Sequence, residues 1–432
     1  MHKSCIHIQN SIYLAPYEIR TCCQRFFVDG KMKGDVSLIV CQDQKDISYA
    51  DVIQAKQALV TGINNGTDDR CNGCFLLKEQ DWDDVADDQI NAISIENHSL
   101  CNMKCSYCSE VYYGGVEPQY SLEYLFEGLD NVGDNLHIAW GGGEPTARKD
   151  FEDLFLLLNK KFHPRTQRIF TNALKYSPVV KTALDERISS ITTSIDAGTE
   201  ETFNLVRGSK GLHKVLQSLE RYSQVSPDLI TIKYIFTQEN FDHHNLQKFV
   251  EQVNAFNLTK CNYLISADFK YKALNDHIVF SIISLYFMLN AEGINAVNFD
   301  DHIFHKVREI GLDVDTYIDN LPQVDSQVQA VKNIINSFKN RENNVIIWGT
   351  GEFSKYLLGT AKNKNLVVSG VVDGMEDKWG SEFMGFEVKP PEFLIDDESD
   401  IIIASVNFYG EVFNRITSLG ISKNRVIPNF LI

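Results

Sequence analysis

Short β-rich runs alternate with amphipathic helical runs about six times between residues 87 and 320, and this alternation limits the fold more than any other feature. Repeated strand–helix units predict a parallel sheet or partial barrel, with the active site at the carboxyl ends of the strands. In the helical run SPVVKTALDERI we expect Ser177 to be the N-cap and Pro178 the first helical residue. The six predicted strands are INAISIENHS, NLHIAWGG, RIFTNAL, SSITTSIDAG, LITIKYIFT and CNYLISADF.

Three cysteines within eight residues follow the first predicted strand directly. They are Cys101, Cys105 and Cys108 in the segment CNMKCSYC. Three thiolates can wrap one face of a cubane 4Fe–4S cluster, which leaves the fourth iron without a protein ligand. A bacterial ferredoxin run would carry a fourth cysteine and a proline soon afterwards, and this segment has neither. A structural zinc loop is the alternative, but zinc normally takes four protein ligands.

Two further motifs follow the triad in order along the chain. The second predicted strand ends in GGGEP (residues 141–145), and the fourth leads into TSIDAG (residues 193–198) and then VRG (residues 206–208). Together with C-x3-C-x2-C and its aromatic residue before the last cysteine, these motifs make the chain resemble the radical S-adenosylmethionine (radical SAM) superfamily over roughly residues 90–270. The resemblance implies an α/β fold built on a partial (β/α)6 barrel.

The resemblance also implies a set of cofactors and ligands. The triad would hold a 4Fe–4S cluster, and S-adenosylmethionine would chelate the open iron through its amino nitrogen and carboxylate. Glu144 would accept hydrogen bonds from that amino group, while Gly142 and Gly143 would let the backbone approach the methionine moiety. Three further positions resemble those that contact the ribose or carboxylate in this family, although capping or ion pairing would also explain them: Asn172, Ser194 and Arg207.

The expected chemistry is reductive cleavage of S-adenosylmethionine to methionine and a 5′-deoxyadenosyl radical, which abstracts hydrogen from a substrate. An electron donor such as flavodoxin or ferredoxin would supply the electron. The first interpretation is an oxidoreductase or epimerase that acts on a small metabolite, such as a nucleotide-linked sugar. A peptide-modifying enzyme is the second. A non-catalytic Fe–S protein is the third, and the intact motifs count against it.

Residues 1–86 hold six of the ten cysteines and predict a separate Cys-rich module. The clip Cys71-x2-Cys74, a Gly-containing turn and an intervening helical stretch resemble the SPASM or twitch modules that bind an auxiliary Fe–S cluster, although those modules usually follow the barrel. We expect Cys71 and Cys74 to act with Cys22 or Cys23. Structural zinc is the alternative. The fourth ligand would be the other member of that pair, Cys41 or Asp35.

Cys261 lies alone on the last strand predicted for the barrel, residues 87–320. Most such cysteines are small core hydrophobes. The other interpretation is a hydrogen donor that faces the site, as an epimerase would need.

The C-terminal region predicts a small third domain. A polar helical linker, residues 321–342, precedes a Rossmann-like α/β unit over residues 343–432. Gly349 and Gly351 lie in a turn between a strand and a helix, and Asp373 ends the next strand at a distance suited to a ribose. The unit resembles modules found in bacterial sugar-nucleotide and polysaccharide-modifying proteins. We therefore expect a bound nucleotide there, with a docking or scaffolding role as the alternative.

Charge and hydropathy limit the partners and the compartment. The chain has 41 Lys plus Arg against 58 Asp plus Glu, and a net charge of −17 repels nucleic acid. The N-terminal segment MHKSCIHIQN has no apolar signal core, and no run approaches the roughly 20 apolar residues of a membrane span. We expect a cytoplasmic protein without a membrane partner, in which the cysteines serve metals rather than a disulfide framework.

Overall fold

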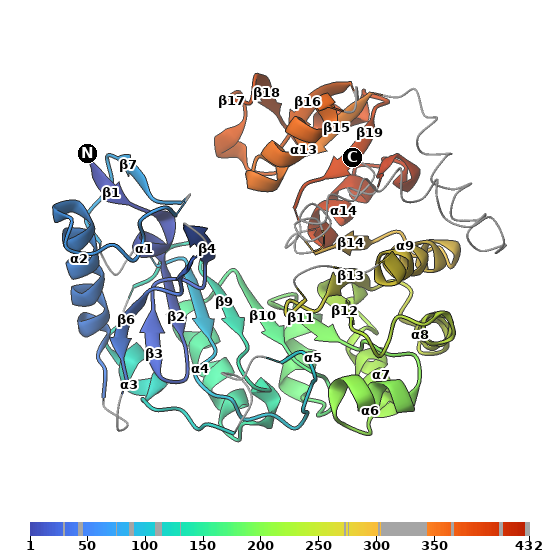
Figure 1. Ribbon diagram of the computed structural model, residues 1–432, viewed down its shortest axis with the longest axis horizontal. Coiled ribbons are helices and arrows are strands. Elements are labelled where there is room, and N and C mark those ends of the chain that lie inside the picture. The colour runs from blue at the N-terminus through green and yellow to red at the C-terminus, as the bar shows by residue number, and fades with distance from the viewer. Residues whose placement is uncertain are drawn as a thin grey trace. The chain divides into compact units, whose positions relative to one another are not determined.

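The structure is a computed structural model of the 432-residue chain. It contains two compact units, Met1–Thr193 and Ser194–Ile432 (Figure 1). The residues that it describes are 1–28, 31–41, 46–74, 76–85, 90–108, 115–129, 131–271, 274, 276–300, 303, 344–363, 367–405 and 409–427. The predicted linker, residues 321–342, lies outside them.

Four parallel strands form the sheet that carries the cysteine triad. Ala92 pairs with His137 at the start of β8 and β9, and Thr166 pairs with the same His137 from β10. Side chains alternate between buried and half-buried along each strand, as expected for a sheet that is covered on one face. The first four predicted strands are confirmed as β8 (Ala92–Ile95), β9 (His137–Trp140), β10 (Thr166–Phe170) and β11 (Ser189–Ser194).

Helices α4 (Phe151–Phe162) and α5 (Pro178–Asp185) each bury one apolar face in the core of this unit. The ring of Trp140 on β9 lies 5.4 Å from the ring of Phe151 and 5.9 Å from that of Phe155. Ser177 caps α5 by accepting a hydrogen bond from the amide of Val180, with Pro178 at the first helical position, which confirms both predictions. Two short elements complete this region: α3 (Leu122–Glu127) and the 3-10 turn η3 (Pro145–Ala147).

The N-terminal segment extends the same sheet. Strand β2 (Ser11–Leu14) pairs in parallel with β8, and the antiparallel strands β3 (Glu18–Arg20) and β6 (Ser37–Val40) follow outward (Figure 1). The segment predicted as a Cys-rich module and the strand before the triad therefore share one sheet. The sequence analysis did not predict these three strands.

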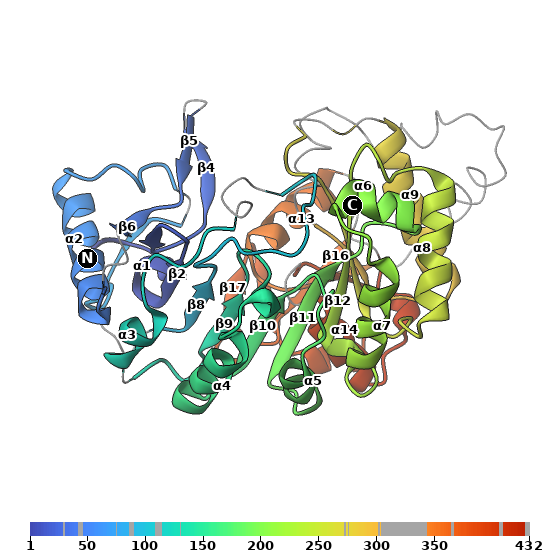
Figure 2. The same cartoon turned by 90° about the horizontal axis from the view of Figure 1, so that it is seen from below.

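The remaining N-terminal elements surround this sheet extension. The long helix α2 (Tyr49–Asn65) begins at Ser48, whose side chain forms a reciprocal capping box with Asp51. Strands β4 (Arg25–Val28) and β5 (Lys31–Gly34) form a hairpin that projects from the rest of the unit (Figure 2). The other elements are α1 (Ile6–Asn10) and the antiparallel pair β1 (His2–Ser4) and β7 (Lys78–Gln80).

The second unit contains three parallel strands with helices between them. Strands β12 (Ile230–Phe236) and β13 (Asn262–Ala267) confirm the last two predicted strands, and β14 (Val297–Phe299) adds one that the sequence analysis missed. No helix among the described residues is both long and apolar enough to cross a bilayer. The helices are α6 (Glu200–Arg207), α7 (Leu212–Tyr222), α8 (His243–Ala255) and the apolar α9 (Asp276–Ala291), with the 3-10 turn η4 (Pro227–Leu229).

A five-stranded sheet forms the C-terminal part of this unit, in the order β17-β18-β16-β15-β19. Strands β15 (Val345–Trp348), β16 (Val368–Val372) and β19 (Asp400–Ile403) are parallel, and β15 and β16 confirm the two strands predicted before Gly349 and before Asp373. The hairpin β17 (Glu382–Phe383) and β18 (Phe386–Lys389) was not predicted. The helical elements are α13 (Glu352–Asn363), α14 (Tyr409–Ser418), η5 (Glu376–Lys378), η6 (Pro391–Ile395) and η7 (Lys423–Arg425).

Candidate functional site

The cysteine triad lies in the loop that follows β8. Two hydrogen bonds close the base of this loop: the Ser99 amide donates to the Val116 carbonyl at 2.9 Å, and the Val116 amide donates to Ser99 Oγ at 2.8 Å. Within the loop, the Cys108 amide donates to the Cys105 carbonyl at 3.1 Å and forms a turn. Cys101 is exposed, while Cys105 and Cys108 are half-buried. All three thiols therefore lie at the accessible carboxyl end of the sheet.

Gly142 and Gly143 are needed because the triad loop passes against them. Gly142 has φ +88°, and a Cβ on Gly143 would lie 2.0 Å from the Leu100 carbonyl oxygen. The Gly143 amide donates to the His98 carbonyl at 3.0 Å, and the Glu144 amide donates to the Leu100 carbonyl at 2.7 Å. The sequence analysis assigned the close backbone approach to a methionine moiety. In the structure, the backbone leading into the triad makes that approach.

Glu144 joins the ends of β9 and β10. One carboxylate oxygen accepts from the Thr146 amide and hydroxyl and from the Thr171 hydroxyl, at 2.6–3.1 Å, and the other accepts from the Asn172 amide at 2.6 Å. Burial raises the pKa of Glu144 against these hydrogen bonds, which act in the opposite direction. A carboxylate oxygen can accept more than one bond, so the second oxygen retains capacity for a further donor.

Asn172 touches the triad loop directly from the end of β10. Its side-chain Nδ2 lies 3.8 Å from the sulfur of Cys101 and donates to Asn102 Oδ1 at 2.6 Å. Its Oδ1 accepts from the Leu174 amide at 3.0 Å, which fixes the orientation of the amide group. Met103 donates its amide to the same sulfur at 3.4 Å. The structure thus brings the predicted residue Asn172 next to the predicted metal ligand Cys101.

His98 and Arg148 lie beneath the triad loop, and the sequence analysis did not single them out. Arg148 donates to Asn97 Oδ1 at 3.0 Å and pairs with Asp150. Burial, followed by the charge of Arg148, lowers the pKa of His98 to about 4. His98 is therefore neutral at physiological pH. No local motif marks either residue, and only the fold shows that they support the loop.

Ser194 and Arg207 belong to the second unit. Ser194 is half-buried at the carboxyl end of β11. Arg207 forms a buried ion pair with Asp196 at 3.0 Å, and the other carboxylate oxygen of Asp196 accepts from the Ile235 amide at 2.7 Å. Burial raises the pKa of Asp196. Arg207 therefore has a carboxylate partner within its own chain, which is the salt-bridge alternative raised by the sequence.

A polar cluster that the sequence analysis missed lies on the half-buried face of the second unit's parallel strands. Lys233 on β12 donates to Asp300 at 2.8 Å, and Ser266 on β13 donates to the same carboxylate oxygen at 2.9 Å. Asp300 directly follows β14 at its carboxyl end. The available signal was a lysine in the otherwise apolar run LITIKYIFT.

The N-terminal cysteines separate into two groups. Cys22, Cys71 and Cys74 line one cavity, and Cys5, which the sequence analysis left out, lies on it as well. Cys23 is exposed and Cys41 is buried, and neither lines that cavity. Among the described residues, no three His, Cys, Asp or Glu side chains are already spaced to hold a metal ion, and this applies to the triad as well.

Cys261 lies at the amino end of β13, directly before Asn262, and is buried. Burial raises the pKa of its thiol. The carboxyl ends of the strands, where Ser266 and Asp300 lie, are at the opposite edge. The position of Cys261 favours the core interpretation over that of a hydrogen donor.

The predicted C-terminal glycine turn joins β15 to α13. Gly349 has φ +116°, and a Cβ on Gly351 would meet open space. Asp373 follows β16 and is already engaged: Thr350 donates to it at 2.7 Å and Lys378 at 3.1 Å. The predicted nucleotide residues are therefore grouped, with a lysine beside the acidic side chain.

These features define a thiolate site of three cysteines at the carboxyl end of a parallel sheet. Asn172, at the end of β10, contacts Cys101 of this site. The family model "Radical SAM superfamily" matches residues 98–250, and "C2185-like, N-terminal" matches residues 341–427. Residues 98–250 thus match the radical SAM family, whose cofactors are a 4Fe–4S cluster and S-adenosylmethionine.

Curated relatives match the same part of the chain. A GTP 3′,8-cyclase of Psychromonas ingrahamii is 28% identical over 153 residues, which cover 34% of this chain and 44% of the relative. The GTP 3′,8-cyclase of Yersinia pestis is 23% identical over 145 residues, which cover 32% of this chain and 44% of the relative. Streptococcus suis SuiB bound to S-adenosylmethionine is a solved structure with 12% identity, coverage of 58% and 61%, and a TM-score of 0.37. The chain spans less than half the length of these curated relatives.

The residues present fit the two cofactors. Three accessible thiols in one loop are the donor set that an Fe–S cluster requires. The buried carboxylate of Glu144 retains acceptor capacity for an ammonium group, and it lies within one hydrogen bond of Asn172, which in turn contacts Cys101. The acceptor and the thiolates therefore belong to one connected network.

Proposed function

We propose that the protein reductively cleaves S-adenosylmethionine and uses the radical to abstract hydrogen from a small metabolite, for oxidation or epimerisation. The observation that carries the proposal is the network that ties the triad loop to GGGE and Asn172. When bound, the cluster and S-adenosylmethionine supply the one-electron chemistry. A flavodoxin or ferredoxin in the cytoplasm would be the electron donor.

The chain's own residues would position the two cofactors and shield them from water. Cys101, Cys105 and Cys108 would bind three irons and leave the fourth iron for S-adenosylmethionine. Glu144, held by four hydrogen bonds, would accept from the ammonium group of S-adenosylmethionine. Asn172 would donate toward Cys101 and hold the loop to β10. The partial (β/α)6 barrel would exclude water around them.

A polar substrate would find partners in the second unit. Lys233 offers a cation and Asp300 a carboxylate on the half-buried face of parallel strands, and Asp300 is at a carboxyl end, where α/β sites form. We place the hydroxyl-rich part of the substrate there. Ser266 hydrogen bonds to Asp300 and would keep that carboxylate oriented.

The C-terminal, Rossmann-like unit would hold a nucleotide handle on the substrate. Gly349 and Gly351 leave the turn open, and the amino terminus of α13 favours a phosphate. Lys378 adds positive charge beside Asp373, which would accept ribose hydroxyls. A nucleotide-linked sugar combines the two requirements, phosphate and hydroxyls.

Isotope transfer tests the substrate. The reconstituted, reduced protein is incubated with S-adenosylmethionine and deuterated nucleotide-sugars or peptides, and deuterium in 5′-deoxyadenosine is measured by mass spectrometry. Label from a nucleotide-sugar is the expected result, and Asp373→Asn should reduce it about tenfold, as for one lost charged hydrogen bond. Label from peptides alone would identify a peptide-modifying enzyme instead.

A further inference from the structure

Four cysteines from three separate segments of the first unit meet at one cavity. Cys5 follows β1, Cys22 follows β3, and Cys71 and Cys74 follow α2. All four line the same cavity, whose remaining wall includes apolar side chains. Three of these apolar residues are Ile8, Val36 and Leu77.

Local hydrogen bonds hold two of these segments in place. Cys5 caps α1, and its sulfur accepts from the Ile8 amide at 3.5 Å. Cys71 and Cys74 lie in one turn, where the Cys74 amide donates to the Cys71 carbonyl at 3.1 Å. Gly73 has φ +89° within that turn, a conformation that a side chain would strain. The sulfurs are therefore carried on fixed backbone.

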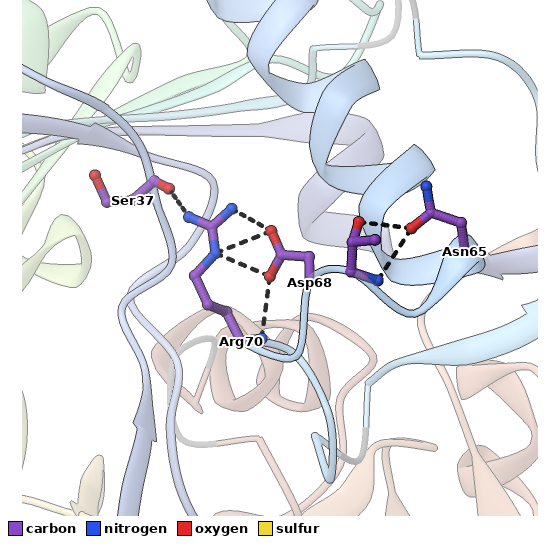
Figure 3. Close-up of polar contacts among 5 residues, drawn as sticks. Ser37, Asn65, Asp68 and Arg70 are labelled. Carbon is purple, nitrogen blue, oxygen red and sulfur yellow. Dashed lines mark hydrogen bonds and ion pairs between the residues drawn. The ribbon is translucent and has the colours of Figure 1, made fainter.

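Arg70 fastens the Cys71–Cys74 turn to the sheet. Figure 3 shows its guanidinium between the carboxylate of Asp68 and the backbone carbonyl of Ser37, at the start of β6. The Arg70 amide also donates to Asp68 at 3.1 Å. Because Ser37 directly follows Val36, which lines the cavity, this anchor holds the turn at the cavity wall.

A buried lysine lies beside the cysteines. Lys56 on α2 is 0% exposed, and its ammonium nitrogen has no hydrogen-bond partner among the described residues. Lys56 interacts electrostatically with Cys5 and His7, and both of these residues line the cavity. A buried ammonium group without a counter-charge is costly. Burial lowers the pKa of Lys56 to about 7, and a negatively charged group in the cysteine cavity would favour its charged form.

We propose that Cys5, Cys22, Cys71 and Cys74 ligate an auxiliary 4Fe–4S cluster, with Lys56 offsetting part of its negative charge. The inference rests on the proposed function only in that a second cluster would serve radical chemistry. It corrects the ligand set expected from the sequence. Cys23 and Cys41 do not line the cavity, and Asp35 pairs with Arg20 at 3.4 Å.

Ligand spacing favours a cluster over a single zinc ion. Structural zinc sites usually take their cysteines from two close-spaced pairs. Here only Cys71 and Cys74 form such a pair, and Cys5 and Cys22 come from isolated positions.

Metal analysis in the full chain tests the inference independently of S-adenosylmethionine cleavage. Cys101, Cys105 and Cys108 are replaced by Ala so that the triad binds nothing, and the protein is reconstituted anaerobically. We expect about four irons and four sulfides per chain, with the Mössbauer signature of a 4Fe–4S cluster. Adding Cys5→Ser or Cys22→Ser should lower the iron at least fourfold, while Cys41→Ser should leave it unchanged.

A second measurement covers the case in which the serine variants misfold. In the triad-alanine protein, the half-buried thiols of Cys22 and Cys74 should react with iodoacetamide only after the cluster has been removed, whereas the exposed Cys23 reacts throughout. Stoichiometric zinc without iron, no metal, or iron lost with Cys41→Ser but kept with Cys5→Ser would each overturn the inference. Iron retained in the triad-alanine protein, together with a parent protein that does not cleave S-adenosylmethionine, would contradict the proposed function alone.

Discussion

The side-chain nitrogen of Asn172 lies 3.8 Å from the sulfur of Cys101, and this contact ties the end of β10 to the predicted cluster ligand. Asn172→Ala removes an N–H donor near a thiolate. We expect S-adenosylmethionine cleavage to fall about tenfold, because one such hydrogen bond contributes roughly 1–1.5 kcal/mol. Initial rates of 5′-deoxyadenosine formation measure the effect.

The control for this variant is Asn204→Ala, which changes an exposed asparagine on α6. Both proteins should bind the same amount of iron, so a difference in rate reports positioning rather than loss of the cluster. Equal cleavage rates in the two variants would show that the Asn172 contact has no role.

Gly143 is the position where a methyl group should do most damage. In Gly143→Ala the new Cβ would lie 2.0 Å from the Leu100 carbonyl oxygen, so the triad loop must move. We expect loss of triad iron and a free energy of unfolding lower by about 1–3 kcal/mol. In the matched Gly141→Ala the nearest atom is the flexible Glu96 side chain at 3.3 Å, and iron should be retained. Full triad iron in Gly143→Ala would contradict the observed packing.

The lowered pKa of His98 predicts that the free energy of unfolding decreases in acid. Its folded pKa is about 4, mainly because of burial and then the charge of Arg148, while its ordinary value is 6.5. Between these values the unfolded chain binds a proton that the folded chain does not, so the free energy of unfolding falls as pH falls from 6.5 to 4. The full effect is roughly 3 kcal/mol.

Chemical denaturation from pH 4 to pH 8 checks this expectation. His98→Gln should show a shallower slope than the parent between pH 4 and 6.5. Identical slopes in the parent and in His98→Gln would rule out the buried neutral histidine.

Lys56 should tune the auxiliary cluster. Burial lowers the pKa of Lys56 to about 7, and the negative charge of a cluster would favour its charged form. In the triad-alanine protein, Lys56→Met removes that charge, so reduction of the cluster, which adds negative charge, becomes harder. The midpoint potential should shift negative by some tens of millivolts. Lys248→Met, which changes an exposed lysine paired with Glu251, should leave it unchanged. A positive shift, or none, would contradict the assigned role of Lys56.

Periodicity and motif order predicted the six main strands, the triad and the GGGE turn, because long alternating runs and close cysteine spacing leave a local signal. Strands β2 and β6 are as long as β8 and β9, but they lack the alternation of buried and half-buried side chains seen there. Cys5 was not predicted as a ligand for a different reason. It has no sequence neighbour that marks it as a ligand, and only the chain's return through β3 and the turn after α2 brings Cys22, Cys71 and Cys74 to it.

Side-chain partners were harder to predict than positions. Arg207 was predicted either to contact the ribose or carboxylate of the cofactor or to form an ion pair, and the structure shows an ion pair with Asp196, eleven residues away. The glycines of GGGE were predicted to approach a ligand, and the structure adds a close approach to the backbone of His98 and Leu100. Both outcomes depend on how loops pack against each other, which spacing alone does not specify.

Formation of 5′-deoxyadenosine is the most direct test of the central claim. The full chain is reconstituted with iron and sulfide, reduced with dithionite without oxygen, and mixed with S-adenosylmethionine. Liquid chromatography with mass spectrometry follows the product over time. We predict steady formation by the parent protein and none by the folded triple variant with Cys101, Cys105 and Cys108 replaced by Ala. Undiminished product from that variant would contradict the assignment of the triad.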